Sequence, residues 1–275
     1  MRNSTDRVWL NQLNCLLQEP DYITYPRGMK VYERSPWNAT FHMWDCVLTV
    51  PERKLNYKFM AAEAYWILTG DDRVATIEPY NPHIKNFSDD GVTFFGAYGP
   101  KIMDQMPYVI NAFKKDLQTR QAVITIWRES PPETKDVPCT VTLAFQLRNG
   151  ALNCHVFMRS SDIWLGLPYD VFNFSMVSHY LLGKLYQEDI VSKNVNVGHL
   201  YFTTASSHLY ETNFEAAKSI ALKHGVVNQI DGFCYTPPEL QYHPKLLLQT
   251  LNALRNSKPG DEARWWEKAK WLNAK

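Results

Sequence analysis

Two residues of this chain have types that together could carry out covalent chemistry. Cys139, in the sequence Val137-Pro138-Cys139-Thr140, offers a thiol that becomes a nucleophile once it is deprotonated, and Arg159 offers a fixed positive charge. A cation close to a cysteine favours the thiolate form. If the fold brings the two side chains together, they indicate attack by sulfur on a substrate that carries a phosphate group.

A predicted β-hairpin would bring this thiol and this guanidinium together. Residues 140–148 and 151–159 are both rich in Val, Leu, Phe and Thr, and they flank Asn149-Gly150, a dipeptide typical of two-residue hairpin turns. The resulting register places Cys139 opposite Ser160, with opposed Cβ atoms about 5 Å apart. Because a β-bulge would shift the pairing by one residue, the sequence predicts proximity rather than contact.

A carboxylate on an apolar helix face is a second unusual feature. Residues 55–69 are expected to form a helix that ends at Gly70, and Glu63 lies on the same side of it as Phe59 and Trp66. Burial without a partner raises the pKa of a carboxyl group, and a carboxyl group with a pKa near neutrality suits general acid–base catalysis. A buried arginine or a backbone N–H group that pairs with Glu63 is an equally good explanation.

Several arginines are candidates for binding a phosphate, because the guanidinium fork matches phosphate oxygens. Arg27 follows Tyr25-Pro26 at an expected turn, and Arg120 lies where a loop meets a strand. Arg159 and Ser160 end the hairpin. A single loop arginine is more often only solvated, and only the neighbouring thiol distinguishes Arg159 from the others.

Two further sites carry polar groups whose role depends on their surroundings. His208 and Tyr210 are two residues apart, so in an extended strand they point to one face, where they would either bind a sugar hydroxyl or pair at a sheet edge. Asp170 follows Pro168 at the start of an expected helix, where an acidic residue often serves only as an N-cap.

The elements expected around these residues mix helices with strands. Helices are expected at residues 7–18, 55–69, 104–117, 169–187 and 213–224 and after Pro259-Gly260-Asp261, and strands within 37–50 and at 121–128 and 199–204, besides the hairpin. Neither a linker-like stretch nor an internal repeat separates them. The sequence therefore predicts one domain of mixed α and β structure over residues 1–275.

The composition argues against several classes of function. The 29 basic and 28 acidic residues give a net charge of +1, which favours neither a nucleic-acid partner nor a membrane surface. No run of about 18 apolar residues predicts a membrane span, and the first residues lead into no apolar signal-peptide core. Five cysteines without a Cys-x-x-Cys pair predict neither a disulfide framework nor a metal site. We therefore expect a reducing, cytoplasmic location, which is the host cytoplasm if the source is viral.

Five motifs, in one consistent order, resemble the thymidylate synthase superfamily. The longest is Arg159-Ser160-Ser161-Asp162-Ile163-Trp164-Leu165-Gly166-Leu167-Pro168-Tyr169-Asp170, where the family pattern reads R-S-x-D-x-x-L-G-L-P-F-N. Pro138-Cys139 resembles the family's P-C nucleophile, and Glu63-Ala64-Tyr65-Trp66 resembles its E-L-x-W helix. Gly96-Ala97-Tyr98-Gly99 resembles its G-x-x-Y-G turn, and His208-Leu209-Tyr210 resembles its H-x-Y sugar clamp.

The resemblance implies a fold, a co-substrate and a reaction. The fold would be α/β, with a bent mixed β-sheet flanked by helices, and two copies would form a homodimer face to face through that sheet. Cys139 would attack C6 of a pyrimidine nucleotide, and C5 would take up a one-carbon unit from 5,10-methylenetetrahydrofolate. Glu63 would transfer protons through ordered water.

The resemblance also assigns the binding residues. Those around the 5′-phosphate would be Arg27, Arg159 and Ser160, with Arg120, in the place of the first arginine of the family's R-R pair, reaching in from the other subunit. His208 and Tyr210 would bind the sugar hydroxyl, and Tyr98 would line the substrate site. The folate would be bordered by Asp162, Leu165, Gly166 and Tyr169.

One departure from the family pattern bears on the substrate. Asp170 stands where the synthases have Asn, whose amide both donates and accepts, as O4 and N3–H of uracil require. Cytosine presents an amino donor at C4 and an acceptor at N3. A carboxylate accepts from the amino group, and a proton shared with N3 satisfies the ring nitrogen. Asp170 therefore favours cytosine, and so does Cys139-Thr140, because the deoxycytidylate hydroxymethylase branch resembles this chain at both positions.

Two other departures bear on phosphate binding and on the product. Gln121 replaces the second arginine of the R-R pair. The apolar C-terminal closing segment of the synthases is not recognisable in Trp271-Leu272-Asn273-Ala274-Lys275. In the synthases that segment excludes water, so that a hydride reduces the exocyclic methylene, and without it water would attack instead. We therefore expect a 5-hydroxymethyltransferase that acts on dCMP or CMP.

Three alternatives stay open on the sequence. A reductive methylase would make 5-methyl-dCMP, which differs from the hydroxymethyl product by one oxygen. A uracil enzyme, either a thymidylate synthase or a dUMP hydroxymethylase, would tolerate Asp170. A non-catalytic relative would only bind nucleotide or RNA, although the near-neutral charge offers RNA little.

Overall fold

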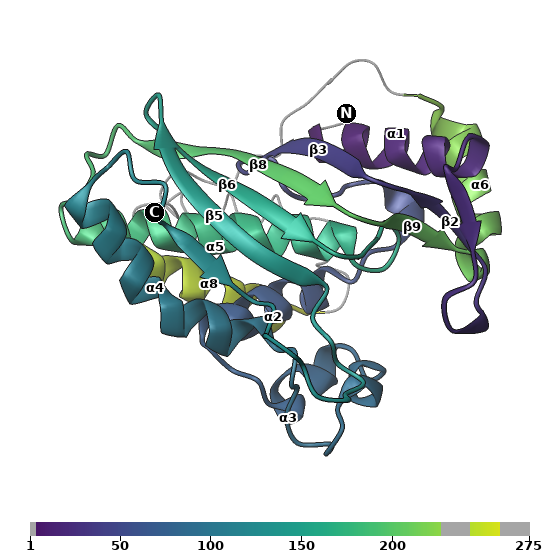
Figure 1. Cartoon of the computed structure of the whole chain (residues 1–275), viewed down its shortest axis with the longest axis horizontal. Helices are drawn as coiled ribbons and strands as arrows, with labels where there is room; N and C mark the ends of the chain where they lie inside the picture. Colours follow the sequence, from purple (N-terminus) through teal and green to yellow (C-terminus); the bar gives the residue numbers. More distant parts are fainter. Residues whose placement is uncertain (1–3, 227–242, 259–275) are drawn as a thin grey trace.

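A computed structural model describes residues 4–226 and 243–258 of the chain, and Figure 1 shows its strands and helices. The helices are α1 (Ser4–Gln18), α2 (Tyr57–Leu68), α3 (Val74–Ile77), α4 (Tyr98–Lys115), α5 (Leu167–Gln187), α6 (Phe214–His224) and α8 (Pro244–Arg255). The strands are β1 (Tyr22–Thr24), β2 (Val31–Arg34), β3 (Trp37–His42), β4 (Val123–Thr125), β5 (Thr140–Arg148), β6 (Ala151–Met158), β7 (Ser161–Asp162), β8 (Asn196–Thr204) and β9 (Ser207–Tyr210). Short 3-10 turns occur at Pro26–Gly28, Pro51–Arg53, Glu78–Tyr80, Ile84–Phe87 and Glu211–Asn213.

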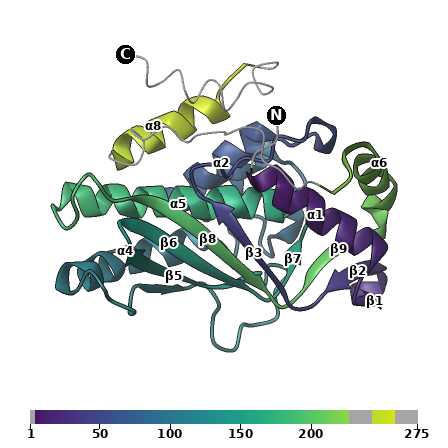
Figure 2. The ribbon, with the colours of Figure 1, turned by 90° about the horizontal axis from the view of Figure 1, so that it is seen from above.

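The strands form two mixed sheets that are joined at a bend. The five-stranded part has the order β3-β8-β6-β5-β4, and the four-stranded part has the order β1-β2-β9-β7. The chain passes directly from β2 to β3, from β6 to β7 and from β8 to β9, so three strands continue across the bend (Figure 2). β6 and β8 are parallel, and the other neighbours in the five-stranded part are antiparallel. The expected mixed sheet is confirmed, and Arg159 and Ser160 lie at the bend between β6 and β7.

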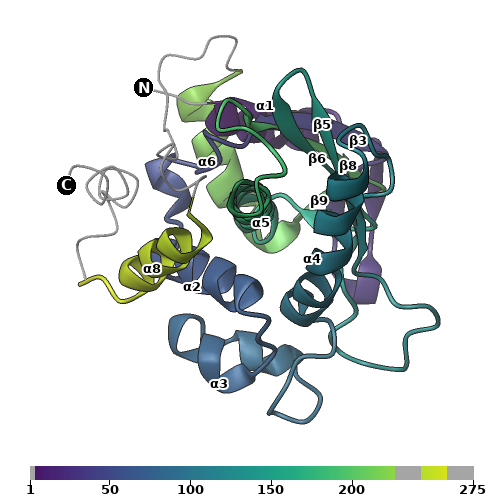
Figure 3. The ribbon, with the colours of Figure 1, turned by 90° about the vertical axis from the view of Figure 1, so that its left-hand side faces the viewer.

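The core lies between this sheet and the long helix α5. α5 packs on β6 and β8, and α2 and α8 form a further layer behind it (Figure 3). Along β6 the buried Val156 alternates with the exposed His155 and Phe157, and along β8 the buried Phe202 follows the exposed Tyr201. This alternation is the period of a strand with one buried face, so the opposite face of the sheet presents aromatic rings to solvent.

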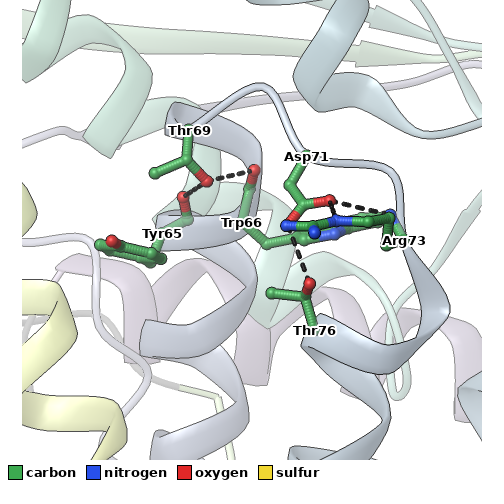
Figure 4. A network of polar contacts seen from close by, with 6 residues as sticks. All are labelled: Tyr65, Trp66, Thr69, Asp71, Arg73 and Thr76. Carbon is green, nitrogen blue, oxygen red and sulfur yellow. Dashed lines mark hydrogen bonds and ion pairs between the residues drawn. The ribbon is translucent and has the colours of Figure 1, made fainter.

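Polar caps at both ends fix the position of α2, which carries Glu63. The side chain of Asn56 accepts a hydrogen bond from a backbone N–H in the first turn, at 3.0 Å. At the other end the Thr69 hydroxyl bonds two carbonyls of the last turn, and Gly70 with φ +69° ends the helix (Figure 4). Asp71 accepts hydrogen bonds from side chains of the following segment (Figure 4).

Some element boundaries differ from the sequence prediction. α4 begins at Tyr98, well before residue 104, because Pro100 is compatible with the first turn of a helix. β3 ends at His42 rather than continuing through residue 50. β4 covers only part of residues 121–128, and its regular ladder ends where two successive N–H groups, those of Ile126 and Trp127, both donate to the carbonyl of Val141.

The helix α8 was not among the predicted elements. Its signals are present in the sequence, since Pro244 opens it and Leu247, Leu251 and Leu254 lie buried at helical spacing. The helix predicted after Pro259 lies outside the described residues. None of the helices in the described part of the chain is both long and apolar enough to cross a membrane.

Candidate active site

A β-bulge brings Cys139 closer to Arg159 than the predicted register would. Between Thr140 and Thr142 the pairing of β5 with β6 shifts by one residue. The N–H of Arg159 consequently donates to the carbonyl of Cys139 at 3.0 Å. The prediction that Cys139 faces Ser160 is therefore wrong by one residue, because an extra residue in one strand displaces every pairing beyond it.

The guanidinium of Arg159 is held against the segment that carries the thiol. Its Nε donates to the carbonyl of Pro138 and its Nη2 to the carbonyl of Val137, both at 2.9 Å. The same Nη2 lies 3.9 Å from Sγ of Cys139. The cation is thus fixed by two backbone carbonyls, and its outer edge remains exposed to solvent.

The thiol of Cys139 experiences opposing influences. Burial raises its pKa, Arg159 and Arg27 lower it, and the nearby Asp170 and Asp136 raise it again. The net shift is upward. The expected influence of Arg159 toward the thiolate is therefore present, but desolvation outweighs the two cations.

Glu63 is paired with an amide that the sequence did not single out. The Nδ2 group of Asn173, on α5, donates to Oε2 of Glu63 at 2.7 Å. Burial raises the pKa of Glu63 to about 7, and the hydrogen bond from Asn173 opposes this shift. The partner is neither of those that the sequence suggested, a buried arginine or a backbone N–H, but a side-chain amide, and the expected upward shift of the pKa by burial is present. The sequence signal that could have identified Asn173 is a polar side chain within an apolar helix, one turn after Asp170.

Asp170 and Tyr98 lie near both Cys139 and each other. Burial, followed by the charge of Glu63, raises the pKa of Asp170 well above its usual range. Burial also raises the pKa of Tyr98, with further contributions from Asp170 and Cys139. The hydroxyl of Tyr98 accepts from the N–H of Thr140 at 3.2 Å and lies 3.0 Å from its hydroxyl. Tyr98 is thus anchored to the strand that follows the nucleophile.

A second polar group forms where β9 meets β2. The rings of His208 and Tyr210 share one face of β9, with centroids 5.2 Å apart. Nη2 of Arg27 donates to the hydroxyl of Tyr210 at 3.1 Å, and Ser206 Oγ lies 3.3 Å from His208 Nδ1. Burial lowers the pKa of His208, and the charge of Arg27 adds to this shift and also lowers the pKa of Cys139, so Arg27 lies within electrostatic range of both.

The loop after β7 presents one free carboxylate oxygen. Oδ1 of Asp162 accepts from the N–H groups of Trp164 and Leu165, at 2.7 and 2.9 Å. Its Oδ2 is buried and has no hydrogen-bond partner within residues 4–226 and 243–258. Beside it the side chain of Leu165 is 58% exposed, and a Cβ added to Gly166 would come within 3.3 Å of Asp170 Oδ2.

Arg53 and Tyr169 hold this loop in place. The guanidinium of Arg53 is buried, donates twice to the carbonyl of Trp164 and stacks on its ring, 4.7 Å from the centroid. The hydroxyl of Tyr169 accepts from the N–H of Asn56 at 3.2 Å. Sequence reasoning did not select Arg53, because nothing in its local sequence separates it from other loop arginines.

Ser160 and Arg120, two further predicted residues, differ in how far they lie from the thiol of Cys139. Ser160 lies at the bend beside Arg159 and is half-buried. Arg120 is exposed and precedes Ala122, whose carbonyl accepts from the N–H of Phe145 at 2.8 Å. The stretch of β5 from Phe145 to Cys139 spans about 20 Å. Arg120 is therefore remote from the thiol of its own subunit.

A known family model matches the part of the chain that carries these residues. The thymidylate synthase family model matches residues 27–226. The chain belongs to the thymidylate synthase family, and its fold is a thymidylate synthase domain.

Three relatives show which members of the family the chain is similar to. One is the deoxyuridylate hydroxymethyltransferase of Bacillus phage SP01, with 31% identity over 231 residues, 76% of this chain and 58% of the relative. Another is the deoxyuridylate hydroxymethyltransferase of Pseudomonas phage M6, with 30% identity over 175 residues, 60% of this chain and 48% of the relative. The thymidylate synthase of Buchnera aphidicola subsp. Baizongia pistaciae (strain Bp) is 25% identical over 186 residues, 63% of this chain and 67% of the relative. The chain thus spans about half the length of the two phage proteins.

Proposed function

We propose that this protein transfers a one-carbon unit to C5 of a pyrimidine nucleotide, with dCMP or CMP as substrate and a 5-hydroxymethyl nucleotide as product. The observation that carries the proposal is the grouping of Cys139, Asp170 and Glu63. After burial, Asp170 contributes to the raised pKa of Cys139 and Glu63 to that of Asp170, which supports a position within electrostatic range for each pair. Asn173, one turn after Asp170 on α5, contacts Glu63 at 2.7 Å. A nucleophile and two acid–base groups then surround one ring.

The proposed chemistry begins at the sulfur. The Cys139 thiolate bonds to C6, and the electron pair of the C5–C6 double bond makes C5 a nucleophile that bonds to the one-carbon unit. C5 then loses its proton, and the bond between the one-carbon unit and the folate nitrogen breaks. Tetrahydrofolate leaves with a proton, and an exocyclic methylene remains on C5. Water adds to the exocyclic methylene of the nucleotide, its proton passes to Glu63, and the C6–S bond breaks to return the thiolate. The hydroxymethyl group stays at the oxidation level of formaldehyde, so no hydride is required.

The two groups of polar side chains beside the thiol suit the rest of the nucleotide. Arg27, Arg159 and Ser160 would bind the 5′-phosphate, since both guanidinium groups act on the thiol electrostatically. With a phosphate bound there, Arg159 and Arg27 would still be positively charged groups near Cys139. His208 and Tyr210 would bind the sugar hydroxyl from the face of β9.

Asp170 would read the base edge. Burial, followed by the charges of Glu63 and Asp162, raises its pKa well above the usual range, which favours the protonated form with one donor and one acceptor. The acceptor pairs with the C4 amino group of cytosine, and the donor pairs with N3. Because N3 of cytosine is basic, it can also share the proton of Asp170, whereas N3 of uracil carries its own hydrogen. This difference favours cytosine.

The residues around the loop after β7 fit a folate. The free, buried Oδ2 of Asp162 is an acceptor for the N–H donors of a pterin, and the exposed Leu165 offers apolar surface beside it. Gly166 and Tyr169 would complete the border. When bound there, 5,10-methylenetetrahydrofolate supplies the one-carbon unit.

A uracil substrate is the second candidate, and the relatives favour it. Both phage proteins are named deoxyuridylate hydroxymethyltransferases. A neutral Asp170 also has a donor for O4 and an acceptor for N3–H, so a dUMP hydroxymethylase is compatible with the same geometry. Reductive methylation is favoured only by the Buchnera relative, which is named a thymidylate synthase.

One experiment separates these candidates. The protein is incubated with 5,10-methylenetetrahydrofolate and each of dCMP, CMP and dUMP, and the products are identified by mass. We expect 5-hydroxymethylcytidylate as the main product. A main product of 5-hydroxymethyl-dUMP would overturn the cytosine assignment, and a methyl product would overturn the hydroxymethyl assignment.

The substitution Asp170→Asn tests the base-reading residue. Asn presents the donor and acceptor expected for uracil and leaves N3 of cytosine without a shared proton. We expect kcat/KM for dCMP to fall about 10- to 100-fold relative to that for dUMP, the cost of one mispaired buried group. An unchanged ratio of the two values would show that another residue reads the base.

We further propose a homodimer that completes the phosphate site. The open face of the five-stranded sheet carries closely spaced rings, including His155 and Tyr201, with centroids 4.7 Å apart, and His42 and His199, also at 4.7 Å. Exposed rings in a contiguous group are typical of a protein interface. Arg120, which is remote from its own thiol, would reach the phosphate of the partner subunit.

A further inference from the structure

The amide of Asn173 is oriented by its contact with Glu63. A carboxylate only accepts hydrogen bonds, so the Nδ2 group of Asn173 must face Oε2 of Glu63, as it does at 2.7 Å. Asn173 is 3% exposed and lies within the apolar run of α5. Its Oδ1 is therefore the atom of the amide that remains available to another donor beside Glu63.

This Oδ1 is an unsatisfied acceptor. It is buried and has no hydrogen-bond partner within the part of the chain that the structure describes. Trp66 lies one turn after Glu63 on the same side of α2, and its Nε1 is a buried donor that also lacks a partner there. Buried polar atoms without protein partners are commonly satisfied by an ordered water, which needs both donors and acceptors around it.

We propose that Asn173 is a positioning residue for the reactive water: its N–H holds Glu63, and its Oδ1 accepts a hydrogen bond from the water that adds to the exocyclic methylene of the nucleotide. This inference rests on the proposed hydroxymethyl transfer. Under this proposal, the side-chain amide of Asn173 on α5 is the reason that water, rather than another nucleophile, adds to the methylene.

The proposed step balances without a reductant. The water oxygen bonds to the methylene carbon, one water proton passes to the carboxylate of Glu63, and the other hydrogen remains on the product hydroxyl. The electron pair of the exocyclic double bond moves into the ring and expels the sulfur of Cys139 from C6. The nearby titratable groups are Asp170 and Tyr169 on α5 and Tyr98 on α4, and all three are shifted toward their neutral forms. Glu63, whose carboxyl group contacts Asn173 directly at 2.7 Å, is the group proposed to take the proton.

The first test measures the Asn173–Glu63 contact without any turnover. Carboxyl carbons are labelled with ¹³C in glutamate, and Glu63 is titrated by NMR in the full-length wild-type protein and in Asn173→Leu. Loss of a hydrogen bond to the charged form should raise the pKa of Glu63, which is about 7 in the wild type, by about one further unit. Asn153→Ala removes another buried asparagine, on β6 outside the site, and should leave the value unchanged. A Glu63 titration that is the same in Asn173→Leu would overturn the positioning role.

The second test asks which nucleophile reaches the methylene. The reaction is run with a small thiol added, and the hydroxymethyl and thioether nucleotides are quantified by mass. Without the acceptor that holds the water, we expect the ratio of hydroxymethyl to thioether product to fall about tenfold in Asn173→Leu. Asn173→Ser keeps a hydroxyl that accepts and donates, so it should restore part of the ratio and provides the comparison if the leucine variant does not fold.

The outcomes separate this inference from the proposed function. A wild-type protein that makes no hydroxymethyl nucleotide from dCMP, CMP or dUMP overturns both. A wild-type protein that makes it, with the same product ratio in Asn173→Leu, Asn173→Ser and Asn153→Ala, overturns only the role of Asn173.

Discussion

At the residue scale, burial has the largest effect on the three groups proposed to do chemistry. It is the main cause of the raised pKa values of Cys139, Glu63 and Asp170. Burial therefore favours the thiol form of Cys139 and the protonated form of Asp170. Fixed cations and one amide oppose this tendency at Cys139 and Glu63.

The contribution of Arg159 to the thiol can be tested directly. Arg159→Met removes the cation that lies 3.9 Å from Sγ, so the pKa of Cys139 should rise and its alkylation by iodoacetamide should become slower and move to higher pH. The rate is followed across pH by peptide mapping of Cys139. Arg128→Met is the control, because Arg128 stacks on Phe95. Identical profiles for wild type and Arg159→Met would contradict the proposed influence.

The buried carboxyl of Glu63 should cost stability at alkaline pH. Its pKa rises from 4.5 to about 7 on folding. As pH increases through this window, the folded state loses stability because it must bury a carboxyl group that is charged in the unfolded chain. Glu63→Gln removes the charge and keeps an acceptor for Asn173. We expect this variant to be more stable than wild type by up to about 3 kcal/mol at pH 8 and equally stable near pH 4.

Urea unfolding at the two pH values measures this difference. Glu215→Gln, at an exposed position of α6, serves as the control and should show no comparable dependence on pH. A Glu63→Gln variant with the same stability difference at both pH values would show that Glu63 does not titrate on folding in this range.

At the element scale, the hairpin of β5 and β6 combines a regular turn with a bulge at the opposite end. Asn149 and Gly150 both have positive φ, 51° and 72°, as a type I′ turn requires. The turn sets the register from Arg148 to Thr142, and the bulge then shifts it at the end that carries Cys139. Regular pairing and the position of the thiol are thus determined at different ends of one element.

The turn should contribute to stability but not to catalysis. A Cβ at Gly150 meets no atom within 4 Å, so Gly150→Ala tests only the backbone conformation. We expect a loss of about 1 kcal/mol in the free energy of unfolding with kcat unchanged. Gly150→Asn is the matched variant, and it should lose less because Asn tolerates positive φ. Equal losses would mean that the positive φ is not what Gly150 supplies.

At the scale of the whole molecule, the bend carries the candidate active site and the open face of the sheet carries the proposed dimer interface. The bend between β6 and β7 gathers Arg159, Ser160 and the loop at Asp162 beside the thiol. The open face exposes Phe157 by 43% and Tyr201 by 36%, which is unusual for large rings on one sheet surface. A second copy on this face would bury these rings and bring its Arg120 toward the site.

Mixing two inactive variants tests the shared site. Cys139→Ala lacks the nucleophile but keeps Arg120, and Arg120→Ala has the reverse defect. If Arg120 acts across a dimer, exchange of subunits should restore about a quarter of wild-type activity, because half of the dimers are mixed and each has one intact site. Activity is measured before and after exchange. No recovery, with dimers demonstrated by light scattering, would place Arg120 outside the site.

Much of the fold was accessible from the sequence. Turn chemistry at Asn149-Gly150 and alternating apolar residues predicted the hairpin, and apolar periodicity predicted α2, α5 and α6. The match of five ordered motifs to one family predicted the fold class. These signals are local, since each depends on neighbours within a few residues of the chain.

Other features were decided only when distant elements packed together. The bulge beside Thr140 reset the partner of Cys139, and burial reversed the expected shift of its pKa. Asn173 contacts Glu63, although the two residues are 110 positions apart in the chain. The sequence by itself determined which chemical groups are present and which secondary structure carries them. Only the tertiary structure decided which groups meet and how far they are desolvated, because contact and burial depend on elements that are remote in sequence.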